Sequence, residues 1–522
     1  MERKEKMKQY SRKGLKEKKV LNKKSNFFYD LIDYLYFIII ILMIFGAVRS
    51  KNFNVENLSN SFWGIVLVIL IGILIFNFKP SFKKWGQEWF KAFNNLFIDR
   101  IGRISLSLFV LAILLQIVIL LNVSMPIGWD VGTLYRGVNT FPNSNPWISV
   151  YLSENPNNSL FFFLMYGYKM VLGFFKIDST WLTWQLLNIV LLDLGIVLIF
   201  KATYRIFGKT IAYVATYLTS MSLMFSPWIL VPYTDIIIIP VIALIMFLYS
   251  KIKVDSINLK ELILLGFFIT VSYLLKPSSV VFLIAWFLIS LIRVGMKETA
   301  NLKQNTIKIL ICISVILLTF FGFNFFKSHQ KAISYDDNKA KPWTHFVMMG
   351  LNGDGGYSRE DSEKTKSLGT QEEKKDYTIK IIKERLNQFG LLGYTKFLVY
   401  KFFKFSSDGD FGWGYDGQQQ QFSTKSKNKL QTMLRDFYSQ DGKRTHNIRF
   451  YMQIIWMITL IGMLFAFRYN DYRDVLFKLT ILGVVAYLLL FEAGRSRYLI
   501  QYIPFFFILS AFGWTKKVHT LK

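Results

Sequence analysis

Cysteine is nearly absent from this chain: among 522 residues only Cys312 carries a thiol, and it stands within an apolar stretch. A single thiol excludes an internal disulfide framework and a cysteine-rich metal site. Histidine is almost as scarce, and the four histidines show no spacing typical of zinc ligands, which argues against catalytic zinc. Any chemistry must therefore be sought among the carboxylates and the cationic side chains.

Charged residues are also few, at 19% of the chain, and acidic ones are the rarer kind: 34 Asp and Glu stand against 63 Lys and Arg. Hydrophobic residues make up 52% and aromatic residues 17%, which is more apolar surface than a soluble domain can use. The runs 62–78 and 280–292 carry no charge and approach the ~20 residues that cross a bilayer. The composition predicts an all-α polytopic membrane protein.

In a soluble protein the net charge of +29 would suggest a nucleic-acid partner. Here the basic residues cluster in particular loops, as expected of cytoplasmic loops, so we expect no nucleic acid to bind. Residues 1–30 lack the apolar core of a signal peptide and are predicted to be a basic cytoplasmic arm lying on anionic headgroups. The same rule predicts about twelve transmembrane helices in a cell membrane, with both termini in the cytoplasm.

The predicted topology divides the chain into five regions. They are the basic arm (1–30), two N-terminal spans with a basic cytoplasmic loop (31–104), the central spans (105–326) with a first outer loop (123–180), an extracytoplasmic segment (327–449), and three C-terminal spans with a short cytoplasmic tail (450–522). The predicted spans are roughly Tyr34–Val48, Phe62–Phe78, Ser105–Asn122, Trp181–Phe200, Ile211–Phe225, Thr234–Ser250, Leu259–Leu274, Ser278–Leu291, Ile307–Phe326, Phe450–Phe467, Val475–Phe491 and Arg497–Trp514.

Two segments outside these spans are also predicted to be helical. Leu160–Phe175 is apolar, but a full crossing would place the basic cluster at 201–209 outside, so we interpret it as a re-entrant or interfacial helix. Lys169, which interrupts it, supports that interpretation. The extracytoplasmic segment is long enough for a small domain and contains a candidate amphipathic helix at 374–405.

Ionisable residues at the outer membrane boundary are the main functional candidates, because a charge there is costly and is retained for a reason. The foremost is Asp130 in the run VSMPIGWDVGTLYRG, a carboxylate beside Trp129 and ahead of Arg136. A carboxylate can act as a general base on a hydroxyl group, and nearby cations can hold a phosphate. The other candidates are Asp235, Lys276, Glu492, Arg495, Arg497 and the acidic turn Asp408, Asp410 and Asp416.

Each candidate also has a purely structural explanation. Asp130 and Asp235 stand where helix N-caps are expected. Lys276 could simply extend its ammonium group to the membrane surface, and Glu492 could pair with the arginines that follow it. The acidic turn lacks the bidentate glutamate of a calcium loop, so a solvated turn is favoured over a metal site there. The sequence requires no metal and leaves a divalent cation open.

Aromatic residues of the extracytoplasmic segment allow two interpretations. Trp343, Trp413 and Tyr415 could stack on sugar rings of an acceptor, or they could form the core of a small domain.

This arrangement resembles the GT-C superfamily of integral membrane glycosyltransferases, such as protein O-mannosyltransferases and the aminoarabinose transferases of lipid A. In that pattern an acidic residue lies in the first large outer loop, matched by Asp130, and a surface-lying helix with prolines follows, matched by 155–175. A second acidic residue that opens a later helix is matched by Asp235, and an outward Lys-Pro turn by Lys276. A late outward arginine near a carboxylate is matched by Glu492, Arg495 and Arg497.

The resemblance covers about 105–514 and departs from the pattern in two places. Many relatives carry adjacent acids in the first loop, whereas Asp130 is followed by Val131, and the two spans before Ser105 are additional. The resemblance implies transfer of a sugar from a polyprenyl-phosphate carrier with inversion. The implied roles are base (Asp130), acceptor-orienting or second acid (Asp235), phosphate binding (Lys276, Arg495, Arg497) and secondary support (Arg136, Glu492).

The implied acceptor lies outside the cell. The residue usage suggests a Gram-positive envelope, so a teichoic acid, a wall polysaccharide or a glycolipid is expected, with a carrier-charging glycosyltransferase and a flippase in the same pathway. A polysaccharide polymerase or ligase is one alternative function. A flippase or other transporter is another, and it predicts charged residues at mid-span and inverted repeats. Asp193 is the clearest mid-span charge, and no repeat is evident.

Overall fold

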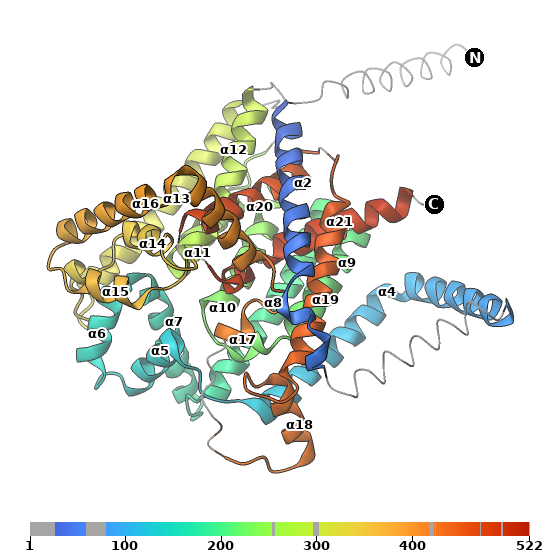
Figure 1. The fold of residues 1–522 in the computed structure, drawn as a ribbon, viewed down its shortest axis with the longest axis horizontal. Helices are drawn as coiled ribbons and strands as arrows, with labels where there is room; N and C mark the ends of the chain where they lie inside the picture. The colour runs from blue at the N-terminus through green and yellow to red at the C-terminus, as the bar shows by residue number, and fades with distance from the viewer. Residues whose placement is uncertain are drawn as a thin grey trace.

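The computed structural model describes residues 27–58, 80–252, 256–295, 302–416, 422, 424–469, 471–491 and 494–520. Within these ranges every regular element is a helix, which confirms the predicted all-α class (Figure 1). Seven stretches are long and apolar enough to cross a membrane. They are Phe27–Val48, Arg100–Val123, Trp181–Phe207, Pro277–Gly295, Lys303–His329, Thr445–Leu464 and Ser496–Val518.

These stretches correspond to α2 (Phe27–Val48), α4 (Pro80–Val123), α8 (Trp181–Phe207), α12 (Val281–Gly295), α13 (Leu302–His329), α19 (Thr445–Leu464) and α21 (Ile503–Thr520), the last preceded by the 3-10 turn η8 (Ser496–Tyr502). Four more helices pack among them: α9 (Lys209–Thr219), α10 (Thr234–Tyr249), α11 (Leu259–Leu275) and α20 (Tyr472–Leu490).

The count of seven is lower than the predicted twelve for identifiable reasons. The predicted span Phe62–Phe78 lies outside the described residues. The helices α9, α10 and α11 have 11, 16 and 17 residues, which at 1.5 Å per residue reach roughly 17–26 Å and fall short of a ~30 Å hydrocarbon core. The helix α20 is long enough but carries three charged residues, Arg473, Asp474 and Lys478. The number of crossings beyond seven therefore stays a prediction.

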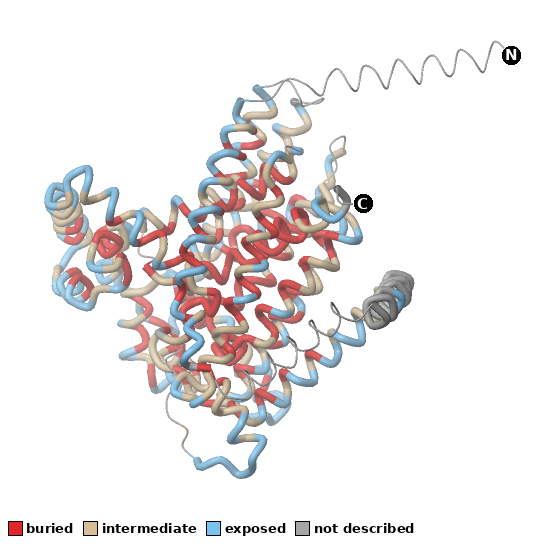
Figure 2. Tube along the Cα trace, turned by 45° about the vertical axis from the view of Figure 1, so that its right-hand side comes forward, coloured by how far each residue is buried: buried red, intermediate tan, exposed pale blue. Residues whose placement is uncertain are grey.

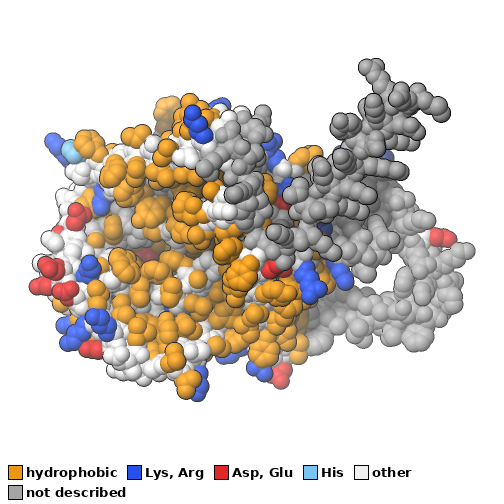
Figure 3. Space-filling model, turned by 90° about the horizontal axis from the view of Figure 1, so that it is seen from above, with side chains coloured by type: hydrophobic (Ala, Val, Ile, Leu, Met, Phe, Trp, Pro, Cys, Tyr) orange, Lys and Arg blue, Asp and Glu red, His pale blue; other side chains and the backbone are white. Residues whose placement is uncertain are grey.

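Burial separates central from peripheral helices. In Ser496–Val518 the apolar window is 83% buried, whereas in Lys303–His329 it is only 6% buried, so α21 lies at the centre and α13 at the edge. Figure 2 shows the same pattern, with buried residues gathered in the middle of the helix bundle. Figure 3 shows hydrophobic side chains over much of one face of the molecule, as expected of a surface that meets lipid.

The basic segment before Ser105 was predicted to be a loop, but it is helical: α4 continues through it from Pro80 to Val123. Proline is favoured at the first position of a helix, and 44 residues extend over about 66 Å, more than a bilayer is thick.

The first outer loop folds into three short helices, α5 (Trp129–Thr140), α6 (Asn145–Glu154) and α7 (Ser159–Phe174). With 16 residues, α7 is shorter than a transmembrane helix, in agreement with the predicted interfacial position. Its lysine has a structural role: Lys169 Nζ donates to the carbonyl oxygens of Val138 and Asn139, each at 3.0 Å. A cation bound there satisfies the C-terminal carbonyls of α5 and ties α7 to it.

The segment 327–449 contains α14 (Trp343–Met349), α15 (Arg359–Lys366), α16 (Gln371–Ser406), α17 (Trp413–Asp416) and α18 (Lys429–Tyr438). The predicted helix at 374–405 lies within α16, but Gly390 interrupts it with a positive φ of 57°, a conformation that glycine adopts readily. A 2.6 Å ion pair between Lys366 and Glu154 joins the segment to α6. The segment and the first outer loop therefore lie at one end of the bundle, called here the Asp130 end.

The opposite end of the bundle contains a buried charge cluster that joins α2 to α20. Lys478 Nζ lies 2.5 Å from Asp33 and 3.3 Å from Asp474, and all three side chains are almost fully buried. Lys478 also donates to the carbonyl oxygen of Tyr469 at 2.7 Å. The ammonium group has partners on two helices and in the turn before α20, so it fixes how these segments pack.

One buried histidine in the segment 327–449 predicts a dependence of stability on pH. His345 is fully buried in α14, its Nδ1 lies 2.8 Å from Thr365 Oγ1, and burial lowers its pKa to about 4. Unfolded histidine has a pKa near 6.5, so between about pH 6.5 and 4 the unfolded chain binds the extra proton. The free energy of unfolding should fall by about 3 kcal/mol as the pH drops through that window.

The melting temperature of the purified protein, measured from neutral to acidic pH, tests this expectation. His345→Asn should flatten the acid-side decline, because the group that must remain neutral is gone. His329→Asn is the matched control, since His329 is exposed at the end of α13. Identical pH profiles for the wild type and His345→Asn would contradict the assignment.

Candidate functional site

Asp130 lies in the first turn of α5 and is bound by side chains from two other segments. The N-cap of this helix is Gly128, so the predicted alternative of Asp130 as an N-cap is wrong. Its Oδ1 accepts a 2.8 Å hydrogen bond from the Tyr151 hydroxyl of α6, and its Oδ2 a 3.3 Å bond from Tyr233, just before α10. The side chain remains partly exposed.

Asn158 completes this hydrogen-bond network. Its Nδ2 donates to the Tyr151 oxygen at 2.7 Å, and its Oδ1 lies 3.1 Å from the Tyr233 hydroxyl. Burial, and then the negative charge of Asp130, raise the pKa of both tyrosines, so both stay protonated and act as donors. The single Tyr233 proton serves two acceptors, which leaves Asp130 Oδ2 the less occupied oxygen of the carboxylate.

Asp235 forms a second centre, in the first turn of α10. Lys276, at the end of α11, donates to its Oδ1, and Arg497 Nε of η8 lies 3.8 Å from its Oδ2. The Asp235 side chain is 2% exposed, and those of Lys276 and Arg497 are 13% and 14% exposed. Lys276 therefore does not extend into water. The three charges sum to +1 in a largely desolvated place.

An aromatic pair joins the two centres. The Arg497 guanidinium lies 4.3 Å from the ring centroid of Trp129, the residue that precedes Asp130. The Trp129 ring in turn meets Tyr233 edge-to-face at 5.9 Å. A cation over the face of an indole is attracted electrostatically, most strongly where water is excluded. Arg497 thus contacts both the helix that carries Asp130 and the carboxylate of Asp235.

The acidic turn lies against this site, and the prediction that it is solvated is wrong. Asp416 is buried and pairs with Arg495 at 2.5 Å, while Asp410 is buried and pairs with Arg449 at 2.7 Å. Gly412 permits this turn because its φ is +74°, a conformation that glycine adopts readily, and a Cβ there would lie 3.3 Å from Asp416 Oδ2. Burial, followed by the charge of Asp410, raises the pKa of the neighbouring Asp408.

Metal binding has no support in the part of the chain that the structure describes, where no group of three or more His, Cys, Asp or Glu side chains could hold an ion. The carboxylates of Asp235, Asp410 and Asp416 are instead paired with lysine or arginine, whereas those of Asp130 and Asp408 accept hydrogen bonds from neutral hydroxyl groups.

Some predicted residues do not join the site. Arg136 is exposed and lies six residues beyond Asp130, about 240° around the axis of α5. Glu492 lies outside the described residues, as does the side chain of Tyr415. Trp413 is fully buried, with its ring centroid 5.7 Å from that of Trp228, so it is a core aromatic.

Sequence reasoning missed the three residues that hold the Asp130 carboxylate in place. Tyr151 and Asn158 stand in the run YLSENPNN, where no periodicity relates them to Asp130. Tyr233 was within reach, because it stands two residues before Asp235 in the same short turn. An aromatic hydroxyl next to a predicted boundary carboxylate is the signal that could have found it.

A family model described as a conserved hypothetical integral membrane protein matches residues 25–518. The chain belongs to this family. It is therefore an integral membrane protein, and the lipid bilayer is its partner. The match includes both centres and the segments that connect them, so the site lies within the conserved family unit rather than in an added region. No curated protein and no solved structure matches the chain.

The charge balance at Asp235 makes a testable prediction. Asp235→Asn leaves Lys276 and Arg497 adjacent and buried without a compensating negative charge. Removing one partner of a buried ion pair costs about 3–5 kcal/mol, so we expect the free energy of unfolding to fall by that amount. The melting temperature of the detergent-purified protein measures the loss.

Two further variants make the test specific. Asp130→Asn should change stability by only about 1 kcal/mol, since Asp130 is partly exposed and its partners are uncharged. Asp235→Asn combined with Lys276→Gln should recover stability relative to Asp235→Asn alone. A double variant as unstable as the sum of the two single variants would mean that these residues do not interact.

Proposed function

We propose that this protein is a membrane glycosyltransferase of the GT-C type that moves a sugar from a polyprenyl-phosphate carrier to an acceptor outside the cell. The observation that carries the proposal is the pairing of two unlike centres. A partly exposed carboxylate with neutral partners adjoins a buried cluster of net positive charge. Removal of a proton and stabilisation of a phosphate leaving group need these two features side by side.

In the proposed reaction, Asp130 Oδ2 accepts the proton of an acceptor hydroxyl as the hydroxyl oxygen attacks the anomeric carbon. The bond between that carbon and the phosphate oxygen breaks, and its electron pair leaves with the phosphate. One displacement inverts the anomeric configuration. Tyr151 and Tyr233 hold the carboxylate in orientation through the hydrogen bonds that they donate to it.

The cations supply the charge that the leaving phosphate requires. Lys276 and Arg497 are already positioned and largely desolvated, so they need little reorganisation when charge develops on the phosphate oxygens. In this proposal Asp235 is the counter-ion of Lys276 and Arg497 in the resting protein. The resemblance implies that it also orients the acceptor, and here it would do so through these two cations. Arg495 pairs with Asp416 and lies at the rim, because its side chain is 35% exposed, more than twice the exposed fraction of Lys276 or Arg497.

The acceptor side of the proposal concerns the Asp130 end. We take this end as extracytoplasmic, because the basic loops lie at the other ends of the helices. The exposed Trp343 of α14 offers a flat apolar surface for a sugar ring of a teichoic acid, a wall polysaccharide or a glycolipid. A carrier-charging glycosyltransferase and a flippase would supply the donor.

A lipid-linked glycan transporter is the second candidate. It is favoured by Asp193, a nearly buried carboxylate in the middle of α8 that accepts a 3.3 Å hydrogen bond from Gln116 of α4. An acid at this depth is costly and is often used in proton or ion movement.

The deciding experiment uses membranes that contain the wild-type protein or Asp130→Asn, supplied with radiolabelled polyprenyl-phosphate sugars and endogenous envelope acceptors. We expect the variant to lose about 10²–10⁴-fold of the transfer rate, the usual contribution of a general base. Asp178→Asn is the matched control, because Asp178 is an exposed carboxylate of the same outer loop. The control should transfer as the wild type does.

Transfer at the wild-type rate by Asp130→Asn would overturn the role of Asp130 as the base. Absence of transfer by the wild type with every carrier, together with movement of labelled carrier across proteoliposomes, would favour the transporter. Loss of that movement in Asp193→Asn would then assign it to the mid-span carboxylate.

A further inference from the structure

A basic cavity lies at the end of the bundle opposite Asp130. It has a volume of 260 Å³ and is bounded by the C-terminal parts of α8, α10 and α12 and the N-terminal parts of α11, α13 and α20. The helix α10 relates the two sites: Asp235 begins it and Tyr249, a wall of this cavity, ends it, which separates them by roughly 21 Å. The cavity is therefore distinct from the Asp130 site.

Four cationic side chains line the cavity, one each from α8, α12, α13 and α20: Arg205, Arg293, Lys308 and Arg473. Among the described lining residues there is no carboxylate. Two contacts hold Arg473 in place. Its Nη1 donates to the carbonyl oxygen of Ile206 at 2.9 Å. Its Nε lies 2.8 Å from the half-exposed carboxylate of Asp471. The Arg293 guanidinium lies 4.2 Å from the centroid of the Tyr472 ring.

The positive-inside rule accounts for basic residues at this boundary, but it predicts side chains that point into water. Here Lys308 is only 6% exposed, Arg293 and Arg473 are partly buried, and Arg205 is exposed, and the four side chains line one cavity from four helices. Asp471 already compensates the charge of Arg473, and an anion in the cavity would in addition be attracted by Arg205, Arg293 and Lys308. Arginine in particular suits the oxygens of a phosphate group.

The cavity also opens toward lipid. Phe287 and Leu291 of α12 line it, yet their side chains are 48% and 51% exposed on the outer surface of the bundle. The neighbouring α13 is almost entirely unburied in its apolar part, as expected of a helix that faces hydrocarbon. An anion with an apolar tail can thus enter sideways from the bilayer and keep its tail in contact with these helices.

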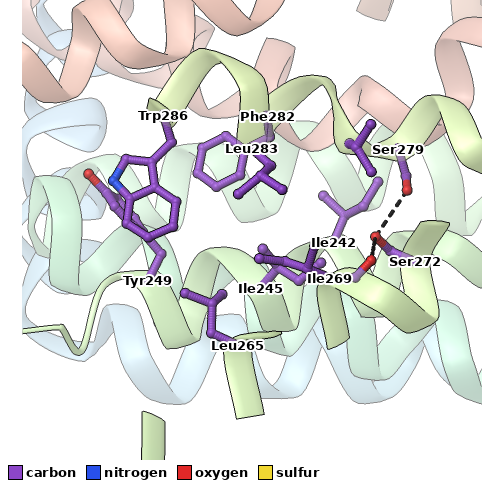
Figure 4. Close-up of a pocket in the computed structure, with 11 residues that line it drawn as sticks. Ile242, Ile245, Tyr249, Leu265, Ile269, Ser272, Ser279, Phe282, Leu283 and Trp286 are labelled. Carbon is purple, nitrogen blue, oxygen red and sulfur yellow. Dashed lines mark hydrogen bonds between the residues drawn. The ribbon is translucent and has the colours of Figure 1, made fainter. Parts of the chain in front are cut away.

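A narrow apolar crevice continues from the cavity between α10, α11 and α12. Tyr249 and Trp286 belong to the walls of both spaces. Figure 4 shows these two rings at one end of the crevice and the Ser272–Ser279 hydrogen bond at the other, with isoleucine and leucine side chains between them. The headgroup space therefore has aromatic walls and apolar side chains directly behind it.

We propose that this cavity binds the phosphate of an anionic phospholipid from the leaflet opposite the Asp130 end. The cavity volume of 260 Å³ is slightly below the ~300 Å³ of the smallest pockets that enclose a drug-sized ligand. The cavity therefore suits the headgroup alone, and the acyl chains stay along α12 and α13. This site does not depend on glycosyl transfer and would exist equally in a transporter.

The test uses the full-length protein in nanodiscs of phosphatidylcholine with or without phosphatidylglycerol, and native mass spectrometry counts the lipids that remain bound. Wild type should retain phosphatidylglycerol in preference to phosphatidylcholine. Arg205→Gln with Arg293→Gln should weaken that retention about tenfold or more, since hydrogen bonds to charged groups are lost. Lys201→Gln with Lys209→Gln is the matched control, because both lysines are exposed near Arg205 and line no part of the cavity.

A second measurement does not depend on the stability of that double variant. Brominated phosphatidylglycerol should quench the fluorescence of wild type more than brominated phosphatidylcholine does, and Trp286→Phe should remove most of the difference. Equal quenching by the two lipids, or equal weakening by the control lysines, would overturn the proposal. Displacement of phosphatidylglycerol by inorganic phosphate alone would show a site for soluble anions and would overturn the lipid assignment.

Discussion

The contact of Asp235 with Lys276 and Arg497 is the interaction on which the Asp130 end is built. It joins the beginning of α10, the end of α11 and the turn that leads into α21, three chain segments that are far apart in sequence. A buried charge is tolerated only where its partner is fixed, so the positions of these helix ends become mutually dependent. Trp129 lies on the Arg497 guanidinium, and the placement of Asp130 follows from that stacking.

The same logic extends to the segment 327–449, which is only partly a peripheral domain. Its glycine-rich turn enters the bundle, and the buried Lys401 Nζ of α16 donates to the carbonyl oxygens of Gly350, Leu489 and Phe491. A single ammonium group thereby satisfies carbonyl groups from the loop after α14 and from the end of α20. The segment 327–449, although hydrophilic in sequence, therefore contributes to the packing of the membrane helices.

Hydropathy and charge rules predicted where most of the apolar helices lie, and the bounds of α10, α11 and α20 to within three residues, because the period and length of an apolar run are local properties. They also selected Asp130, Asp235, Lys276 and Arg497, which the structure brings together. What they could not supply are pairings between distant segments: Tyr151 on Asp130, Asp416 on Arg495, Lys169 on the end of α5. The buried acidic turn was misjudged for the same reason, since its partners lie elsewhere in the chain.

The link between Lys169 and the end of α5 has a mechanical consequence. A short helix that lies in the membrane interface moves with the lipid surface, while the long helices of the bundle keep their own height. In this chain, however, α7 is tied to α5 by Lys169 and to α8 by the Tyr168 hydroxyl, which donates to the carbonyl oxygen of Thr183 at 3.0 Å. The helix that carries Asp130 is thus fixed to the bundle through α7 as well as through Trp129, so the protein, rather than the thickness of the host membrane, sets the distance between the carboxylate and the cations.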